Sequence, residues 1–371
     1  MLKTRRILTV LSVFAFVFVH FSLASAQIRT VLVSPVPNDP VASGTALRNA
    51  LAAIPSPSST NRWLLKIEPG IYEMQSNSLQ MRSWVDIEGS GIGVTIIRAN
   101  SNSFNINTVL GASDAELRML TVEATGGPSV GVGLVAAMRN TQGSPRVSKV
   151  KFLTQAVNSD AWGMVNVSTA PKIEDCEFNV SGTRTNSGVT FSGTVVGARS
   201  SIVRSKIAVA WGSTNYGVFM SVTQTLNEMQ DTQIDVTGGP LTLGIFASPV
   251  GGWQSNETLT LRNVVINSAQ GGLASAGIWL DQGTTVNLDI YNSKILGQFS
   301  PSATGIYQGG LAPIILRFSR VAGQTKTVDS AQNVSIAFTD LVGGPVTVAG
   351  WLGCMALIDE NGIFYPNTCP N

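Results

Sequence analysis

Residues 173–178 read Ile-Glu-Asp-Cys-Glu-Phe, residues 261–266 read Leu-Arg-Asn-Val-Val-Ile, and residues 290–295 read Ile-Tyr-Asn-Ser-Lys-Ile. Each stretch has an aliphatic residue, a small or apolar residue three positions later, and another apolar residue two positions after that. The pattern recurs at steps of 20 to 32 residues and predicts a repeat architecture. Its starts are Leu117, Val147, Ile173, Ile202, Met229, Leu261, Ile290, Leu316 and Ile336.

A second pattern, glycine followed by an aliphatic residue, runs in phase with the first. It lies 15 or 16 residues after the corresponding start, at Gly133, Gly163, Gly188, Gly217, Gly244, Gly277 and Gly305. The short β-branched runs between turn residues predict strands rather than helices. A repeat built of strands buries its apolar side only by stacking on the next repeat. We therefore predict an all-β fold, a right-handed parallel β-helix, because a propeller needs repeats of ~40 residues or more.

Residues 1–26 are predicted to be a signal peptide that is removed. Lys3, Arg5 and Arg6 precede an apolar run over residues 7–23, and residues 24–26, Ala-Ser-Ala, form a small-residue cleavage site. A retained membrane anchor is the alternative, although the run is shorter than the ~20 residues that span a bilayer. Export predicts a secreted, periplasmic or extracellular protein with no integral membrane segment.

Composition excludes several classes of function. Removal of the signal peptide leaves 21 basic against 22 acidic residues with no basic cluster, so nucleic acid is not an expected partner. The one histidine, His20, lies in the signal peptide. Ser-His-Asp hydrolysis, Cys-His proteolysis and histidine-ligated zinc chemistry all require an imidazole and are excluded.

The ends of a solenoid need covers, because terminal turns expose core side chains and strand edges. Leu47, Leu51 and Ile54 recur at helical spacing, so a short capping helix is predicted over residues 44–54, within an N-terminal segment of residues 27–62. The β-helix is predicted over residues 63–350, with a C-terminal cap or tail over residues 351–371. A Cys354–Cys369 disulfide is expected to staple that tail, and Cys176 is expected to be a buried small hydrophobe.

The N-terminal part carries a family resemblance. Residues 45–51 read Thr-Ala-Leu-Arg-Asn-Ala-Leu, residues 65–73 read Leu-Lys-Ile-Glu-Pro-Gly-Ile-Tyr-Glu, residues 87–91 read Ile-Glu-Gly-Ser-Gly, and residues 95–97 read Thr-Ile-Ile. This resembles the opening of the pectinesterase and pectin-lyase-like β-helix families. The resemblance implies the superfamily's fold, and its residues are structural; Gly70 and Gly91 are expected at turns that need a positive φ.

The catalytic motifs of those families are not found. Residues 155–157, Gln-Ala-Val, and residues 230–232, Gln-Asp-Thr, resemble two pectinesterase fragments, but they are too far apart and the family's further motifs do not follow. Glu174, Asp175 and Glu177 could supply calcium ligands. A solvated strand face is the favoured interpretation, because neighbouring strand residues point to opposite sides. No cofactor is predicted.

The residue after each aliphatic position of the second pattern is aromatic in four consecutive repeats: Phe219, Phe246, Trp279 and Tyr307. If the aliphatic residues face the core, the four rings face outward and form a strip of roughly 15 Å at the strand spacing of a sheet. Sugar rings pack on aromatic side chains, so a polysaccharide site is predicted there, with Asp281 beside it. Trp162, Trp211 and Trp253 lie near turns and could extend the strip. The alternative is that the rings only stabilise the sheet or are covered.

Three functions remain open. The first is an exported, non-catalytic β-helix that binds polysaccharide or forms part of a surface or appendage structure. The second is a polysaccharide lyase or carbohydrate esterase that uses an unrecognised acidic and arginine site. The third is a purely structural rod without a ligand. We predict the first, because every familiar catalytic set of the fold is missing.

Overall fold

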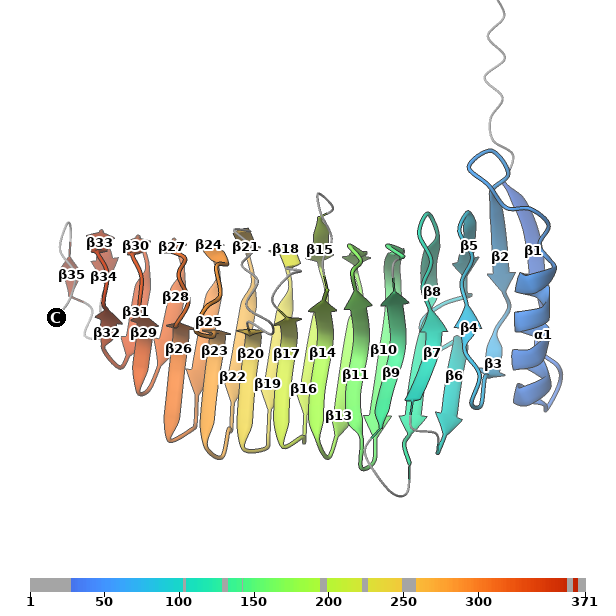
Figure 1. Cartoon of the computed structure of the whole chain (residues 1–371), viewed down its shortest axis with the longest axis horizontal. Helices are drawn as coiled ribbons and strands as arrows, with labels where there is room; N and C mark the ends of the chain where they lie inside the picture. Colours follow the sequence, from blue (N-terminus) through green and yellow to red (C-terminus); the bar gives the residue numbers. More distant parts are fainter. Residues whose placement is uncertain are drawn as a thin grey trace, which may run out of the picture.

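A computed structural model describes residues 28–102, 105–128, 133–141, 143–193, 199–221, 226–248, 258–358 and 363–365. The chain winds as a parallel β-helix, with a helix at one end and the coils stacked along the long axis (Figure 1). The predicted signal peptide, His20 and Trp253 lie outside the described residues. No helix of the described ranges is long and apolar enough to cross a membrane.

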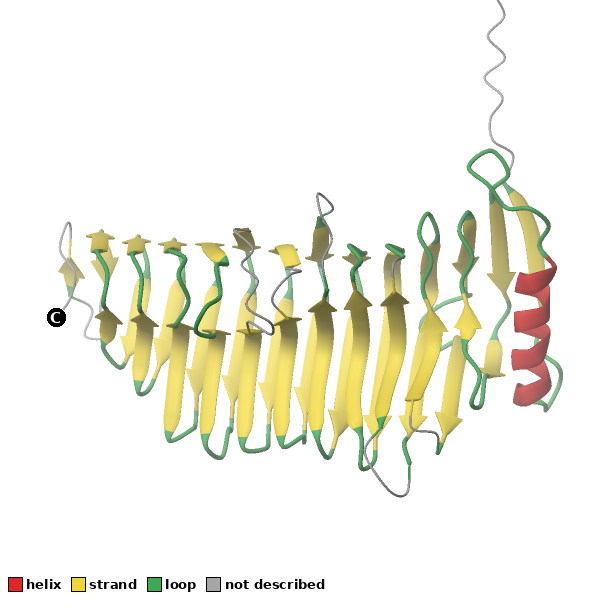
Figure 2. Ribbon diagram, in the orientation of Figure 1, coloured by secondary structure: helices red, strands yellow, loops and turns green. Residues whose placement is uncertain are grey.

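Three faces run the length of the solenoid (Figure 2). The first two belong to one continuous sheet that bends at a corner, and the third is a separate sheet of 11 described strands. The first face contains β1 (Arg29–Val33), β2 (Trp63–Ile67), β5 (Val85–Glu88), β12 (Lys172–Glu174), β15 (Ser200–Val203), β18 (Leu226–Gln230), β21 (Thr258–Arg262), β24 (Asn287–Tyr291), β27 (Ile314–Arg317), β30 (Val334–Ala337) and β33 (Leu352–Met355).

The second face contains β3 (Gly70–Glu73), β6 (Thr95–Ser101), β13 (Glu177–Gly182), β16 (Lys206–Ala210), β19 (Gln233–Thr237), β22 (Val265–Ala269), β25 (Lys294–Gln298), β28 (Arg320–Gly323), β31 (Asp340–Gly343) and β34 (Leu357–Ile358). Two long strands, β8 (Glu116–Gly126) and β10 (Arg146–Ala156), continue through the corner and belong to both faces. A short strand, β35 (Phe364–Tyr365), pairs antiparallel with β34.

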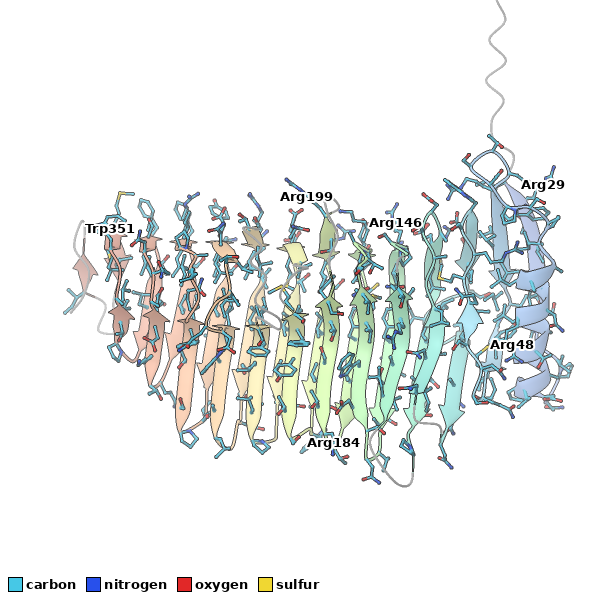
Figure 3. The ribbon with its side chains drawn as sticks, viewed as in Figure 1. Arg29, Arg48, Arg146, Arg184, Arg199 and Trp351 are labelled. Carbon is cyan, nitrogen blue, oxygen red and sulfur yellow. The ribbon has the colours of Figure 1, made fainter. Side chains whose placement is uncertain are left out.

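The third face contains β4 (Leu79–Gln80), β7 (Asn105–Leu110), β9 (Leu134–Thr141), β11 (Asp160–Val167), β14 (Thr185–Ser192), β17 (Thr214–Ser221), β20 (Leu241–Ser248), β23 (Ala274–Leu280), β26 (Ser302–Gln308), β29 (Lys326–Ser330) and β32 (Val346–Val348). Arg184 lies at the edge where the second face turns into the third, and Arg146 and Arg199 lie at the opposite edge (Figure 3). Apolar residues from all three faces fill one continuous core.

The first sequence pattern marks the corner between the first and second faces. Its starting aliphatic residues are fully buried, as at Ile173 and Ile290. Two positions later the backbone takes a left-handed conformation, with φ of 53° at Asp175 and 47° at Asn292. The next residue points inward and is usually Ser or Thr. The Ser293 hydroxyl donates to the Tyr291 carbonyl and accepts from the Val264 amide. A small polar side chain at this position therefore provides hydrogen-bond partners for backbone groups at the bend between the two strands.

Cys176 occupies this inward position in its own coil. Its thiol lies 3.2 Å from the Glu174 carbonyl oxygen, as a hydroxyl would, and its amide donates to the Ser205 hydroxyl. The side chain is a free cysteine with 3% exposure, which confirms the expected buried small hydrophobe. Burial raises the pKa of the Cys176 thiol to about 12.

The second sequence pattern marks the third face. The methyl group of an alanine at position 217 would lie 2.5 Å from the Gly244 carbonyl oxygen of the next coil and would also meet the Ile234 side chain. The strand pairing passes over this glycine, since Tyr216 pairs with Leu243 and Val218 with Ile245. The glycine therefore permits a local kink that lets Tyr216 and Phe219 both face outward.

The capping helix is confirmed, and α1 spans Pro40–Ala53. It begins four residues earlier than expected, because the Asp39 side chain accepts a hydrogen bond from the Ala42 amide and Pro40 occupies the first turn. Leu47 and Leu51 are buried against the first coils. At the other end, the Arg82 guanidinium donates to the carbonyls of Leu51, Ala52 and Ile54, which stabilises the helix C-terminus.

The sheets extend beyond the expected limits of the solenoid at both ends. β1 precedes the helix in the chain and pairs with β2, which follows it, so the helix connects two neighbouring strands of the first face. β33 pairs with β30 through Ile336 and Cys354, so the coil continues past residue 350. Cys369 lies outside the described residues, and the structure does not establish the expected disulfide-stapled tail. The Cys354–Cys369 bond stays a prediction. A parallel β-helix with an N-terminal capping helix is the architecture that the opening motifs implied.

Candidate functional site

The four aromatic residues of the predicted strip occupy one column on the outside of the third face. Phe219 pairs with Phe246, Phe246 with Trp279, and Trp279 with Tyr307. The aliphatic residues that precede them, Val218, Ile245, Ile278 and Ile306, each have 0% exposure. The four aromatic side chains are half-buried on the outer side. We call these four residues the aromatic row.

The rings of the row pack in two different ways. The centroids of Phe219 and Phe246 are 5.6 Å apart at an interplanar angle of 13°, so the two rings stack face to face. The centroids of Trp279 and Tyr307 are 4.2 Å apart at 35°, so these ring planes diverge. Stacked rings cover one another's faces and present mainly their edges. The two pairs of rings therefore differ in geometry within one column.

Tyr216 is a member of this cluster that the sequence pattern did not single out. Its ring centroid lies 5.3 Å from that of Phe219 and 5.1 Å from that of Phe246. Burial raises the pKa of Tyr216 above its ordinary value. The neighbouring coils carry Ser187 and Leu243 at the paired positions, so no aromatic periodicity marks this column. The one sequence feature that could have identified Tyr216 is local, an aromatic residue directly before the glycine.

The polar groups at the C-terminal end of the row are engaged within the fold. Asp329 pairs with Tyr307 in the sheet, and its carboxylate lies 2.6 Å from the Lys326 ammonium. Asp281 follows β23, and its carboxylate accepts from the Gln282 amide at 2.9 Å. The Thr284 hydroxyl donates to the Asp281 carbonyl. Asp281 thus shapes the turn after Trp279.

The two tryptophans near turns that the structure describes, Trp162 and Trp211, do not lengthen the row. Trp162 lies on the third face, but in the column of Tyr216, through Ser187. Trp211 lies in the turn between β16 and β17 and is 77% exposed. Its position belongs to the corner between the second and third faces rather than to the column of Phe219.

The acidic run over residues 174–177 does not converge. Asp175 lies in the left-handed bend and accepts two hydrogen bonds from Arg204, which hold the pKa of its carboxyl below the ordinary value. Glu174 pairs with Arg146 at 3.1 Å, and Glu177 with Lys151 at 3.1 Å. Each carboxylate therefore has a basic partner, and Arg204 also lies 3.7 Å from Glu174. Within the described ranges, no three acidic, cysteine or histidine side chains gather as metal ligands would.

The two fragments that resemble pectinesterase motifs lie on different parts of the surface. Gln155 lies near the end of β10 on the second face, and Asp231 lies in the corner bend three coils later. The Asp231 carboxylate accepts from the Asn263 and Gln230 side-chain amides. The fold does not bring the two fragments together as one site.

Comparisons with known proteins find likeness at the level of the fold. No family model matches the chain, and no curated protein matches it in sequence. The solved structures that resemble it include the Dettilon tailspike protein, with 9% identity over 86% of this chain and 68% of that one, at a TM-score of 0.46. They also include the catalytic domain of a GH87 α-1,3-glucanase in complex with nigerose (11%, 86% and 65%, TM-score 0.41) and the pectin methylesterase PemA from Erwinia chrysanthemi (11%, 90% and 84%, TM-score 0.34). The chain spans about two thirds of the length of the tailspike and glucanase structures.

Proposed function

We propose that this chain is an exported, non-catalytic β-helix protein that binds polysaccharide along the aromatic row. The observation that carries the proposal is the register of the row, with four aromatic side chains on the outside of four consecutive coils. The strands beneath them are fixed by parallel pairing, so the rings hold their spacing without a ligand. A preordered surface of this kind binds with little loss of conformational entropy.

The dimensions suit an extended sugar chain. Coils of a parallel sheet repeat at about 4.8 Å, so the row is roughly 15 Å long and matches about three sugar residues. The tilted pair, Trp279 and Tyr307, is the preferred platform, because it includes the one indole of the row and its ring planes diverge by 35°. Phe219 and Phe246 contribute their edges and support the platform from the neighbouring coils.

The absence of catalysis is part of the proposal, and two features support it. The chain after residue 26 has no histidine. Asp281, beside the row, is engaged in its own turn. Retaining and inverting glycosidases need two carboxyl groups about 5–10 Å apart around the scissile bond. In the third-face column of the row, the nearest acidic residue, Asp329, is bonded to Lys326.

The test is a glycan-array screen on the chain from Gln27 onward. We expect the wild type to retain a polysaccharide and a Phe219→Ala, Trp279→Ala, Tyr307→Ala variant to lose it. Leu273→Ala is the matched control, since Leu273 is a 71% exposed side chain in the turn before β23 and should be dispensable. Shortening of the bound polymer would favour a lyase, release of methanol or acetate from it at unchanged length would favour an esterase, and no binding at all would favour a structural rod.

Export is tested separately. Expression of the full chain in a secreting host should yield a protein whose N-terminal residue is Gln27. Retention of residues 1–26 in the membrane fraction would contradict the signal-peptide prediction and support an anchor.

A further inference from the structure

A hollow of about 380 Å³ lies on the second face, separate from the aromatic row. Its floor is formed where the outward positions of β16 are the alanines Ala208 and Ala210. In the same two columns the neighbouring coils carry larger polar residues, Asn179 and Asp235 beside Ala208, and Ser181 and Thr237 beside Ala210. The hollow therefore arises because these two alanine side chains are shorter than their neighbours in the adjacent coils. The side chains on either side of it can form hydrogen bonds. Its volume falls within the range of small-molecule sites, about 300–1,000 Å³.

Trp211 forms one side of the hollow and is the most unusual residue near it. It follows Ala210 directly, has a φ of 71°, and is 77% exposed. A left-handed backbone conformation is unfavourable for a bulky side chain, and the equivalent corner of the next coil has Gly238 with a φ of 72°. The same corner is also left-handed at Gln270 and Phe299, so the bend belongs to the coil, and what distinguishes Trp211 is an exposed indole beside a hollow.

The walls of the hollow favour a neutral ligand. Glu123 and Asp235 are its charged lining residues, and none of the residues that line it is Lys or Arg. Glu123 is bonded to Arg98 at 2.5 Å. Among the described residues, Asp235 accepts hydrogen bonds from two neutral amides, those of Gln233 at 2.6 Å and Asn267 at 2.7 Å. An anion would meet this carboxylate without a basic partner, whereas hydroxyl groups would donate to it in charge-assisted bonds.

We propose that this hollow is a second carbohydrate site, which takes a neutral sugar unit stacked on the Trp211 indole. The sugar hydroxyls face Asp235 and Asn179, and its apolar face lies on the ring. The shared corner between β16 and β17 places this site on a different face from the aromatic row, so either site can be lost without the other. The proposal does not depend on the function proposed for the row.

The test is calorimetric titration of the mature chain with neutral tetrasaccharides: cello-, laminari-, malto- and mannotetraose. We expect at least one to bind, Trp211→Ala to weaken it by about tenfold, as truncation of a buried aromatic contact does, and Ala208→Phe to abolish it by filling the floor. Tetragalacturonate, an acidic tetramer, should not compete.

Two control variants separate this site from the rest of the surface. Phe299 occupies the same kind of corner three coils away, with a φ of 54° and 67% exposure, but does not line the hollow. Phe299→Ala should bind the tetrasaccharide as the wild type does, and so should Leu273→Ala, which changes an exposed side chain outside the hollow. Absence of binding by every neutral tetramer, or binding by Trp211→Ala as tight as by the wild type, would overturn the proposal.

Discussion

The aromatic row and the Trp211 hollow present aromatic rings in opposite ways. In the row, Phe219 and Phe246 stack on each other and on Tyr216, and their side chains are half-buried. In the hollow, Trp211 stands 77% exposed and has no aromatic ring against it among the described residues. The first arrangement contributes to the sheet because the rings bury one another. The second contributes little to packing and leaves the ring available to a ligand.

The difference shows that aromatic residues at the spacing of the coil repeat do not by themselves indicate a binding surface. A column of aromatic residues at the coil repeat is what both a stabilising stack and a binding strip require. The packing of the rings changes within the row itself, from an interplanar angle of 13° at Phe219–Phe246 to 35° at Trp279–Tyr307. We therefore expect stability and binding to divide along the row.

The largest effect on stability is expected from substitution of Gly217, which lies two residues before Phe219. Gly217→Ala should lower the free energy of unfolding by about 3 kcal/mol, because its methyl group would meet the backbone of the next coil and the Ile234 side chain. Gly272→Ala is the control, since its nearest atoms would lie 3.7 Å away, and it should change stability by less than about 0.5 kcal/mol. Urea unfolding followed by circular dichroism measures both. Equal stability of the two variants would contradict the close approach of the coils.

The next largest effect on stability is expected from the Phe219–Phe246 stack, compared with Trp211 at the hollow. A Phe219→Ala, Phe246→Ala variant should lose about 2 kcal/mol of stability, because it removes a stacked pair and its apolar contacts. Trp211→Ala should stay within about 0.5 kcal/mol of the wild type, as exposed positions do. The same unfolding experiment gives both values. A larger loss at Trp211 than in the double variant would reverse the comparison.

A smaller effect is expected from pH. Because burial raises the pKa of Tyr216, the folded chain favours the neutral phenol. That contribution is complete below the unfolded-state pKa of about 10 and is lost as pH rises through the higher folded-state pKa. Tyr216→Phe should therefore lose less stability than the wild type between neutral and strongly alkaline pH. Identical alkaline profiles would show that Tyr216 is not buried in the stack.

The smallest effect concerns the strain at Trp211. Trp211→Gly should raise stability by roughly 0.5 kcal/mol, because glycine accepts a φ of 71° without the cost borne by a bulky residue. Thermal unfolding measures the change. A more stable variant that no longer binds the neutral tetrasaccharide would show that the strain is kept for the site. A less stable one would show that the indole packs usefully against its corner.

The fold was predictable because each coil repeats the same local requirements. The two sequence patterns mark an inward small residue after a left-handed bend and a glycine where two coils nearly touch, as at Ser293 and Gly217. Burial also follows the predicted side of the strands at Val218 and Phe219. Such positions can be read from sequence, since they depend on steric limits that recur in every coil.

The candidate sites were predictable only in part. The outward direction of the row follows from strand alternation, but ring angles and the contribution of Tyr216 depend on packing between coils. The Trp211 hollow arises from two alanines whose effect appears only when their neighbours in adjacent coils are known. The earlier helix start at Pro40 did have a local signal, Asp39 followed by proline, which the apolar spacing alone does not include.

The most direct test of the aromatic row as the polysaccharide site is oxidative footprinting of aromatic side chains in the mature chain, with and without the polysaccharide that it retains on the glycan array. We predict that ligand protects all four rings of the row, most strongly Trp279 and Tyr307, with less protection of Phe219 and Phe246 because these two rings present mainly their edges. Protection confined to other faces of the solenoid, with Trp279 and Tyr307 as reactive as before, would contradict the assignment of the aromatic row as the polysaccharide site.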